Sequence, residues 1–277
     1  MIKLGILSSL LLAAQCAVAG VSEEDFASPK GDALAKELEA RGEDVGVIVP
    51  ANANKFEVVT SIAKLVFDVS QAPDLKSWTE EKLVPAMRKW VVELSDLMAS
   101  DGWQPPKNIK FQFVTEPLKS SSGAPAWACT WEGKVCLRAD WFRENLDGEA
   151  LGAAVHELVH IMQSYDGKGR TKKNCPGWLV EGYADYIRWF LFEPEADGCG
   201  YVKDEPYKRH YNDSYRVTAH FLDFVERHFP GTMKKLNAAL RDHTFDNGKF
   251  WKDMTGKTVE ELEAEWKKEM KSTVSQA

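Results

Sequence analysis

Apolar and polar positions follow two different periods along the chain, one typical of strands and one typical of helices. The segment from Val58 to Val69 is apolar and rich in β-branched residues, and apolar and polar residues alternate over 109–113. Both segments predict strands, and residues 127–138 predict a β-hairpin. Between residues 77 and 99, apolar residues recur at helical spacing, which predicts a long amphipathic helix.

After about residue 148 the pattern becomes almost entirely helical. Helices are expected near 148–164, 177–192, 214–229, 232–242 and 258–271. Capping boxes are predicted at Ser77 with Glu80 and at Thr258 with Glu261. Strands and one helix therefore come first, and helices follow. This order predicts an α+β fold: a small mixed β-sheet packed on helices, followed by a mainly helical C-terminal half.

The first residues have the pattern of a secretory signal peptide. Lys3 precedes a short apolar run over 4–14, and Ala17 and Ala19 fit a small-x-small cleavage site. Cleavage after Ala19 predicts a secreted protein, extracellular or periplasmic, and an uncleaved anchor is the alternative. We therefore divide the chain into three parts: a signal peptide over 1–19, an N-terminal extension over 20–55, and one domain over 56–277.

Composition narrows the possible partners. Of the 277 residues, 44% are hydrophobic and 28% charged, which are ordinary values for a globular protein. The formal net charge of −7 argues against a general basic surface for nucleic acid. No segment after the signal peptide approaches a membrane span. We therefore expect no nucleic acid and, after signal cleavage, no membrane as a partner.

Four cysteines remain after the signal peptide: Cys129, Cys136, Cys175 and Cys199. An even number of cysteines in a secreted chain predicts disulfides. Three pairings are possible, of which Cys129–Cys136 would close the predicted hairpin and Cys175–Cys199 would follow from it. The alternative is four buried free thiols.

The segment His156-Glu157-Leu158-Val159-His160 carries the clearest chemical signal in the chain. On a helix, residues four apart lie on one face about one turn apart, so two imidazoles at this spacing can bind one metal ion. Glu157 lies at the edge of that face, where it can polarise a metal-bound water instead of binding the metal. The alternative is a core helix with two hydrogen-bonded histidines.

Catalytic zinc usually has three protein ligands and a water, so a third ligand is required. A histidine six residues after His160 would fit, but Asp166 occupies that position. Asp166 itself and Glu181 are the remaining candidates. The sequence favours Glu181, because Pro-Gly at 176–177 suits a helix start and the residues around Glu181 are apolar. Asp185 follows one turn later and can accept a hydrogen bond from a ligand histidine.

These motifs resemble the pattern of gluzincins, the thermolysin-like metallopeptidases. They are more similar to those of the basic secretory protein family, peptidases of plants and bacteria, in order and spacing from about residue 56 to 270. The stretches concerned are 65–70, 72–75, 156–163, 179–188 and 215–222. The resemblance implies a zincin-like zinc peptidase with His156, His160 and Glu181 as Zn²⁺ ligands and Glu157 as general base. The chain departs from that family in being acidic and in carrying residues 20–52.

A zinc peptidase also needs a donor for the oxyanion that forms at the attacked carbonyl. Tyr215, at the start of a predicted helix, is our candidate. His210, Tyr211 and His220 are its rivals. A peptide substrate is expected along an edge strand near 134–138, where it would form main-chain hydrogen bonds.

Together these features predict a secreted zinc-dependent peptidase that hydrolyses peptide or protein substrates through a zinc-bound water activated by Glu157. One alternative is a secreted defence or binding protein that retains a structural zinc site without proteolysis. Another is a metal hydrolase of non-peptide amides. All three share the zinc site, so the sequence separates them poorly.

Overall fold

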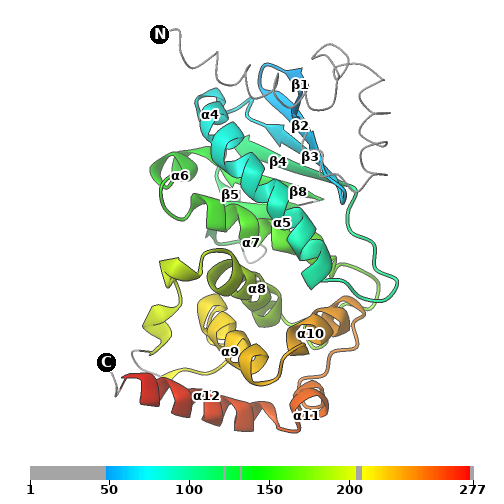
Figure 1. Ribbon diagram of the computed structural model, residues 1–277, viewed down its shortest axis with the longest axis vertical. Helices are drawn as coiled ribbons and strands as arrows, with labels where there is room; N and C mark the ends of the chain where they lie inside the picture. The colour runs from blue at the N-terminus through cyan, green and yellow to red at the C-terminus, as the bar shows by residue number, and fades with distance from the viewer. Residues whose placement is uncertain (1–47, 121–122, 132, 204–207, 275–277) are drawn as a thin grey trace, which may run out of the picture.

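The computed structural model describes residues 48–120, 123–131, 133–203 and 208–274. The predicted signal peptide and residues 20–47 of the predicted extension lie outside the described residues. The β-sheet forms the upper part of the view in Figure 1, and the later helices form the lower part. The predicted fold class, a mixed sheet followed by a mainly helical C-terminal half, is confirmed.

A six-stranded mixed sheet occupies the first half of the described chain, in the order β1-β2-β3-β4-β8-β7. Its strands are β1 (Ile48–Asn52), β2 (Lys55–Val59), β3 (Lys64–Asp68), β4 (Asn108–Val114), β7 (Ala128–Trp131) and β8 (Lys134–Arg138). The pairs β3–β4 and β4–β8 are parallel, and the other pairs are antiparallel. A separate two-stranded sheet pairs β5 (Leu118–Lys119) with β6 (Pro125–Ala126).

The segment expected as one strand from Val58 to Val69 is two strands. The Thr60 hydroxyl bonds with the Ala63 backbone and turns the chain between β2 and β3. The sheet also begins before the predicted domain does, because β1 and the first residue of β2 fall within the predicted extension.

One face of the sheet forms the hydrophobic core. On β4, the alternating residues Ile109, Phe111 and Phe113 are buried, as their spacing predicts. The rings of Phe56 and Phe67 stack with centroids 5.4 Å apart, and those of Phe67 and Phe111 with centroids 5.1 Å apart. This aromatic row crosses three strands and fixes their register.

A continuous helical segment connects β3 with the parallel strand β4, as a parallel pair requires. It consists of α4 (Lys76–Trp78), a π-helical stretch (Thr79–Leu83) and α5 (Val84–Leu97). The predicted helix over 77–99 is therefore confirmed. The capping box at Ser77 with Glu80 is wrong, because the helix has already begun at Lys76 and no side chain caps it there.

The second half contains the five predicted helices and two short ones that the pattern did not indicate, α6 and α11. Their bounds are α6 (Ala139–Glu144), α7 (Ala150–Gln163), α8 (Gly177–Tyr186) with a π-helical continuation (Ile187–Phe192), α9 (Tyr215–His228), α10 (Thr232–Arg241), α11 (Phe250–Thr255) and α12 (Val259–Val274). Short 3-10 turns lie at Pro73–Leu75, Pro194–Ala196 and Gly200–Lys203. The capping box of Thr258 and Glu261 forms in both directions.

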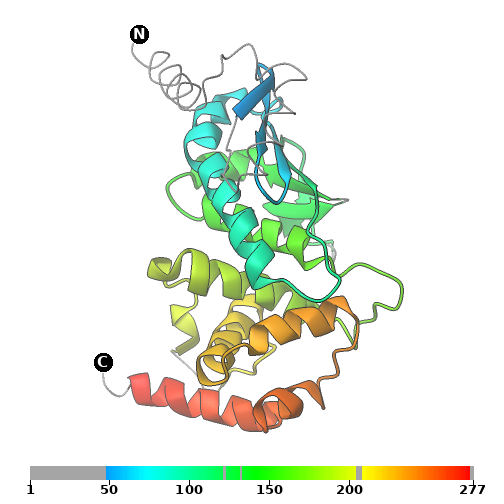
Figure 2. The same cartoon turned by 45° about the vertical axis from the view of Figure 1, so that its right-hand side comes forward.

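The helices α8 and α9 pack closely at Gly182. A methyl group in place of its hydrogen would overlap the side chain of Thr218 on α9, so glycine permits this approach. In both views α12 lies at the end of the molecule farthest from the sheet (Figures 1 and 2). Within the described residues, no helix combines the length and the apolar character needed to cross a membrane.

The predicted disulfides are not borne out. The described cysteines, Cys129, Cys136, Cys175 and Cys199, are free thiols. Cys129 and Cys136 lie directly opposite each other on β7 and β8, as the predicted hairpin requires, but no disulfide joins them. Cys175 and Cys199 are buried in different surroundings, Cys175 beside Arg170 and Cys199 near Asp185.

Candidate metal centre

A cleft with a volume of about 710 Å³ lies where the sheet half meets the helical half. Residues of β7, α6, α7, α8 and the first turn of α9 line it. Along its floor runs α7, which carries His156, Glu157 and His160. The predicted site residues, including Glu181 and Tyr215, therefore all line one cleft.

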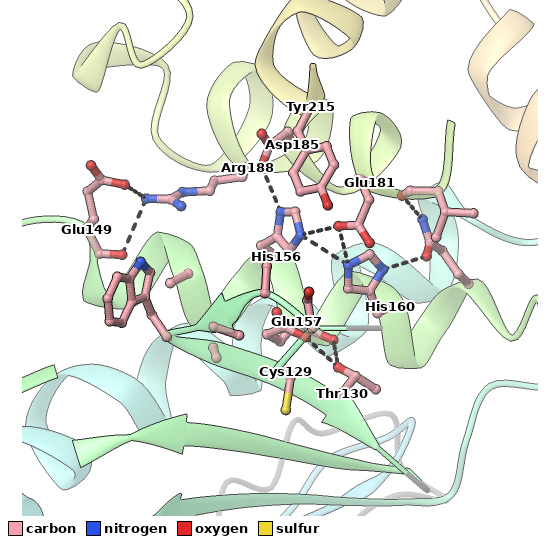
Figure 3. A pocket seen from close by; sticks show the side chains of 18 of the residues that line it. Cys129, Thr130, Glu149, His156, Glu157, His160, Glu181, Asp185, Arg188 and Tyr215 are labelled. Carbon is pink, nitrogen blue, oxygen red and sulfur yellow. Dashed lines mark hydrogen bonds and ion pairs between the residues drawn. The ribbon is translucent and has the colours of Figure 1, made fainter. Parts of the chain in front are cut away.

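Three side chains converge at the centre of this cleft (Figure 3). The Nε2 atoms of His156 and His160 lie 3.1 Å apart, and Glu181 Oε2 lies 3.3 Å from each of them. A tetrahedral zinc ion with bonds of about 2.0–2.1 Å separates its ligand atoms by about 3.3 Å. The three atoms thus form a triangle of the size that one zinc ion requires. Within the described residues this is the group of His, Cys, Asp and Glu whose geometry suits a metal ion.

The outer nitrogen of each imidazole has a hydrogen-bond acceptor. His156 Nδ1 lies 2.7 Å from Asp185 Oδ1, and His160 Nδ1 lies 2.8 Å from Gln163 Oε1. Gln163 is oriented because its Nε2 donates to the Val180 carbonyl at 2.8 Å. Both Nδ1 atoms must therefore carry hydrogen, and both Nε2 atoms of the neutral rings present lone pairs. Two lone pairs and a carboxylate oxygen this close together repel one another unless a cation lies among them.

The surrounding charges also favour a cation here. Burial lowers the pKa of His156, but Asp185 and Glu181 outweigh burial and raise that pKa to about 10. For Glu181 burial raises the pKa, but the two neighbouring imidazoles outweigh burial and hold the pKa well below its usual range. The carboxylates thus favour positive charge at the cluster, and zinc would supply it.

Glu157 is held from the opposite side by the sheet. Its side chain is buried, and the Thr130 hydroxyl on β7 donates to Glu157 Oε2 at 2.8 Å. The same hydroxyl lies 3.1 Å from the backbone carbonyl of Glu157. Thr130 therefore fixes one carboxylate oxygen next to the metal-ligand cluster. No local sequence pattern predicts this contact, because it depends on how β7 packs against α7.

The end of α7 is fixed by residues that the sequence analysis did not assign. Besides Gln163, which binds His160, Arg241 donates to the carbonyls of Met162 and Gln163 at 3.1 and 3.0 Å. These carbonyls have no partner within the helix, so a cation at this helix end is stabilising. Gln163 lies three residues after His160, on the same face of the helix. That spacing in the sequence predicts a contact between the two side chains.

The rival third ligand and the two rival histidines for the oxyanion donor lie outside the cluster. Asp166, the rival third ligand, lies at the cleft rim, exposed and paired with Arg170, and outside the ligand cluster. His210 is exposed and bonds Glu263, while buried His220 accepts a hydrogen bond from Trp266. Neither of these histidines is among the described residues that line the cleft.

Of the two tyrosines considered as oxyanion donors, one lines the cleft and the other does not. Tyr211 accepts a hydrogen bond from Asn247 and does not line the cleft. Tyr215, the first residue of α9, lines it, and its hydroxyl points toward the cluster (Figure 3). The helix is capped by Ser214, which accepts from the Val217 amide. Burial and the carboxylates of Glu181 and Asp185 raise the pKa of Tyr215, so its hydroxyl keeps its proton.

The edge strand beside the cleft is β7, not the strand near 134–138. The latter is β8, which lies between β4 and β7 and has both sides paired. The Arg138 amide donates to the Trp127 carbonyl, so the backbone groups of Trp127 point toward β8. In an antiparallel pair, residues whose backbone groups point toward the partner strand alternate with residues whose backbone groups point away from it. Trp127 and Cys129 thus face β8, and the backbone groups of Ala128 and Thr130 point outward.

A mixed sheet, a helical half and two imidazoles with one carboxylate at a cleft define an α+β protein with a ready set of metal ligands. Residues 137–266 match the family model described as "Peptidase of plants and bacteria". The match is shorter than the expected 56–270, but it contains the whole of α7, α8 and α9. It begins after β7, so Thr130 lies outside it. No curated protein and no solved structure matches the chain.

Proposed function

We propose that the protein is a secreted zinc-dependent peptidase. The observation that carries the proposal is the triangle of two imidazole nitrogens and one carboxylate oxygen, with edges of 3.1 to 3.3 Å. Its dimensions suit a zinc ion, and the lone-pair arrangement needs a cation. His156, His160 and Glu181 would hold the ion, and the family match over residues 137–266 supports peptide bonds as the substrate.

A bound zinc ion would supply Lewis acidity and a water of lowered pKa. Glu157 would take a proton from the attacking water and pass it to the leaving amine. Its carboxylate suits this role because one oxygen is held by Thr130 and the other remains available. Asp185 and Gln163 would keep both imidazoles in the tautomer whose Nε2 faces the ion.

Two further groups would act on the substrate. The Tyr215 hydroxyl, protonated and aimed at the cluster, would donate to the oxyanion that develops at the scissile carbonyl. The free outer edge of β7 would pair with an extended peptide through the backbone groups of Ala128 and Thr130. Because Thr130 also holds Glu157, this pairing would bring the peptide into a fixed register relative to the general base.

Secretion rests on the N-terminal pattern of Lys3, the apolar run and the small residues before Gly20. An N-terminal sequence of the exported protein that begins at Gly20 would support it. A protein retained in the cell with Met1 in place would contradict it.

The test of the reaction pairs metal content with cleavage. We expect one zinc per chain, cleavage of a mixed peptide library that a chelator abolishes, and a Glu157→Gln variant that retains zinc but loses cleavage. Asp166→Asn is the matched control, since it removes a carboxylate from the same cleft outside the ligand cluster. This control should retain both zinc and cleavage.

The possible failures are distinct. Full activity in Glu157→Gln would refute the role of that residue. Loss of zinc in Asp166→Asn, but not in Glu181→Gln, would transfer the third ligand to Asp166. Stoichiometric zinc without cleavage of any peptide would favour the alternative of a binding protein with a structural zinc site.

A further inference from the structure

An exposed aromatic residue lines the cleft close to the cluster. Trp127 has 46% of its surface exposed, although most large apolar side chains of the described chain are buried. It lies in the bend between β6 and β7, at the start of the cleft's edge strand. An indole left open in a cleft is a common feature of a surface that binds a ligand.

Trp127 is held rigidly by its neighbours. Its ring stacks on that of Trp141 with centroids 6.2 Å apart and an interplanar angle of 11°. Trp141 packs edge-on against the fully buried Phe142, which joins this pair to the core. The Arg138 guanidinium lies 5.0 Å from the centroid of Trp127. We name Trp127 and Trp141, both of which line the cleft, the indole pair.

The indole pair lies close to the proposed reaction. Trp127 is three residues before Thr130, whose hydroxyl bonds Glu157. An extended chain rises about 3.3 Å per residue, so the indole pair lies about 10 Å along the strand from the general base. That distance corresponds to about three residues of an extended substrate, counted from the scissile bond.

Space for a side chain exists at this end of the cleft. The residue of α7 that lines the cleft one turn before His156 is Ala153, which has only a methyl group. The charged residues that line this end are paired: Glu149 lies 2.9 Å from Arg188 and 3.1 Å from Arg216. These charges are already neutralised, so they do not favour a charged group on the substrate. The exposed surface at this end of the cleft is the aromatic side chain of Trp127.

We infer that the indole pair is the subsite for an aromatic or large aliphatic side chain within three residues of the scissile bond. This inference rests on the proposed peptidase function and specifies its substrate class. A flat, rigid indole surface stacks on aromatic rings and buries aliphatic chains at low entropic cost. Peptides with such a residue are therefore the preferred substrates.

The experiment compares peptides that differ only by Phe or Ala at one position. Library cleavage by the zinc-loaded protein first identifies the preferred positions. The wild-type protein should then cleave the Phe peptide with kcat/KM about 10- to 100-fold above that of the Ala peptide. Trp127→Ala should reduce this ratio about tenfold and leave cleavage of the Ala peptide nearly unchanged. Tyr201→Ala, which removes an exposed aromatic residue outside the cleft, should leave the ratio unchanged.

Equal losses on both peptides in Trp127→Ala, or a Phe preference that survives it, would overturn the subsite while the peptidase stands. If the wild-type protein cleaves no peptide, the proposed function fails, and calorimetric binding tests the subsite alone. The Phe peptide should then bind the Glu157→Gln protein about tenfold more tightly than the Ala peptide, and Trp127→Ala should abolish the difference. Equal binding of the two peptides would overturn the inference.

Discussion

Replacing Thr130 with valine tests the contact between the sheet and the proposed general base. Valine keeps the branched shape of threonine but removes the hydroxyl that donates to Glu157 Oε2 at 2.8 Å. The carboxylate then keeps its charge but loses the donor that orients it. Because Thr130 is not one of the three clustered ligands, the substitution should leave the zinc content unchanged.

The size of the effect follows from the charge on the acceptor. A hydrogen bond to an ionised group contributes about 1.5–3 kcal/mol, which corresponds to a factor of about 10 to 150 in rate. We therefore expect kcat of Thr130→Val to fall at least about tenfold. KM should change little, because the outward backbone groups of β7 remain.

The assay measures kcat, KM and zinc per chain for Thr130→Val and for Thr130→Ser. Serine retains the hydroxyl and should restore most of the activity. A valine variant with unchanged kcat would refute the positioning role. If serine and valine lose the same activity, the effect comes from packing of β7 and not from the hydrogen bond.

Three further predictions concern other parts of the molecule. Asp185→Ala should weaken zinc binding about 10- to 100-fold in competition with a chelator, since His156 Nδ1 loses its acceptor; unchanged affinity would contradict the tautomer argument. Tyr215→Phe should retain zinc and lower kcat about 100-fold, and normal kcat would exclude its hydroxyl as the oxyanion donor. Asp68 is buried, and hydrogen bonds from Ser70 and two lysines outweigh burial and lower its pKa from 3.8 to about 2. Its stabilising contribution is therefore present above pH 3.8 and lost as the pH falls through 2, so Asp68→Asn should lower the free energy of unfolding by at most about 2 kcal/mol at pH 7. Urea unfolding of both proteins at pH 7 and pH 2 checks this, and a difference that persists at pH 2 would contradict it.

The local geometry of the site was predictable because a helix fixes the relation between nearby residues. His156 and His160 converge as their spacing requires, and Glu181 and Asp185 both face the imidazoles from the next helix. Gln163 was missed although its position three residues after His160 predicts a contact on the same face.

Contacts between segments that are distant in the sequence could not be predicted from local spacing. The hairpin over 127–138 was correctly predicted, but which of its strands lies at the edge depends on the order of the sheet. The parallel pairing of β4 with β8 leaves β7 outside, and no local pattern encodes that pairing. For the same reason the bond from Thr130 to Glu157, across 27 positions of sequence, has no signature in either segment.

The site is built on two adjacent helices, each of which has its own main packing partner. The helix α7 supplies His156 and His160 and packs on the sheet, whereas α8 supplies Glu181 and packs on α9, which begins with Tyr215. The position of Tyr215, the proposed oxyanion donor, relative to Glu181, the proposed third ligand, is therefore set by the α8–α9 contact. At Gly182, the residue after Glu181, a methyl group would overlap the Thr218 side chain on α9. The requirement for glycine at 182 is thus a requirement of the site geometry as well as of the core.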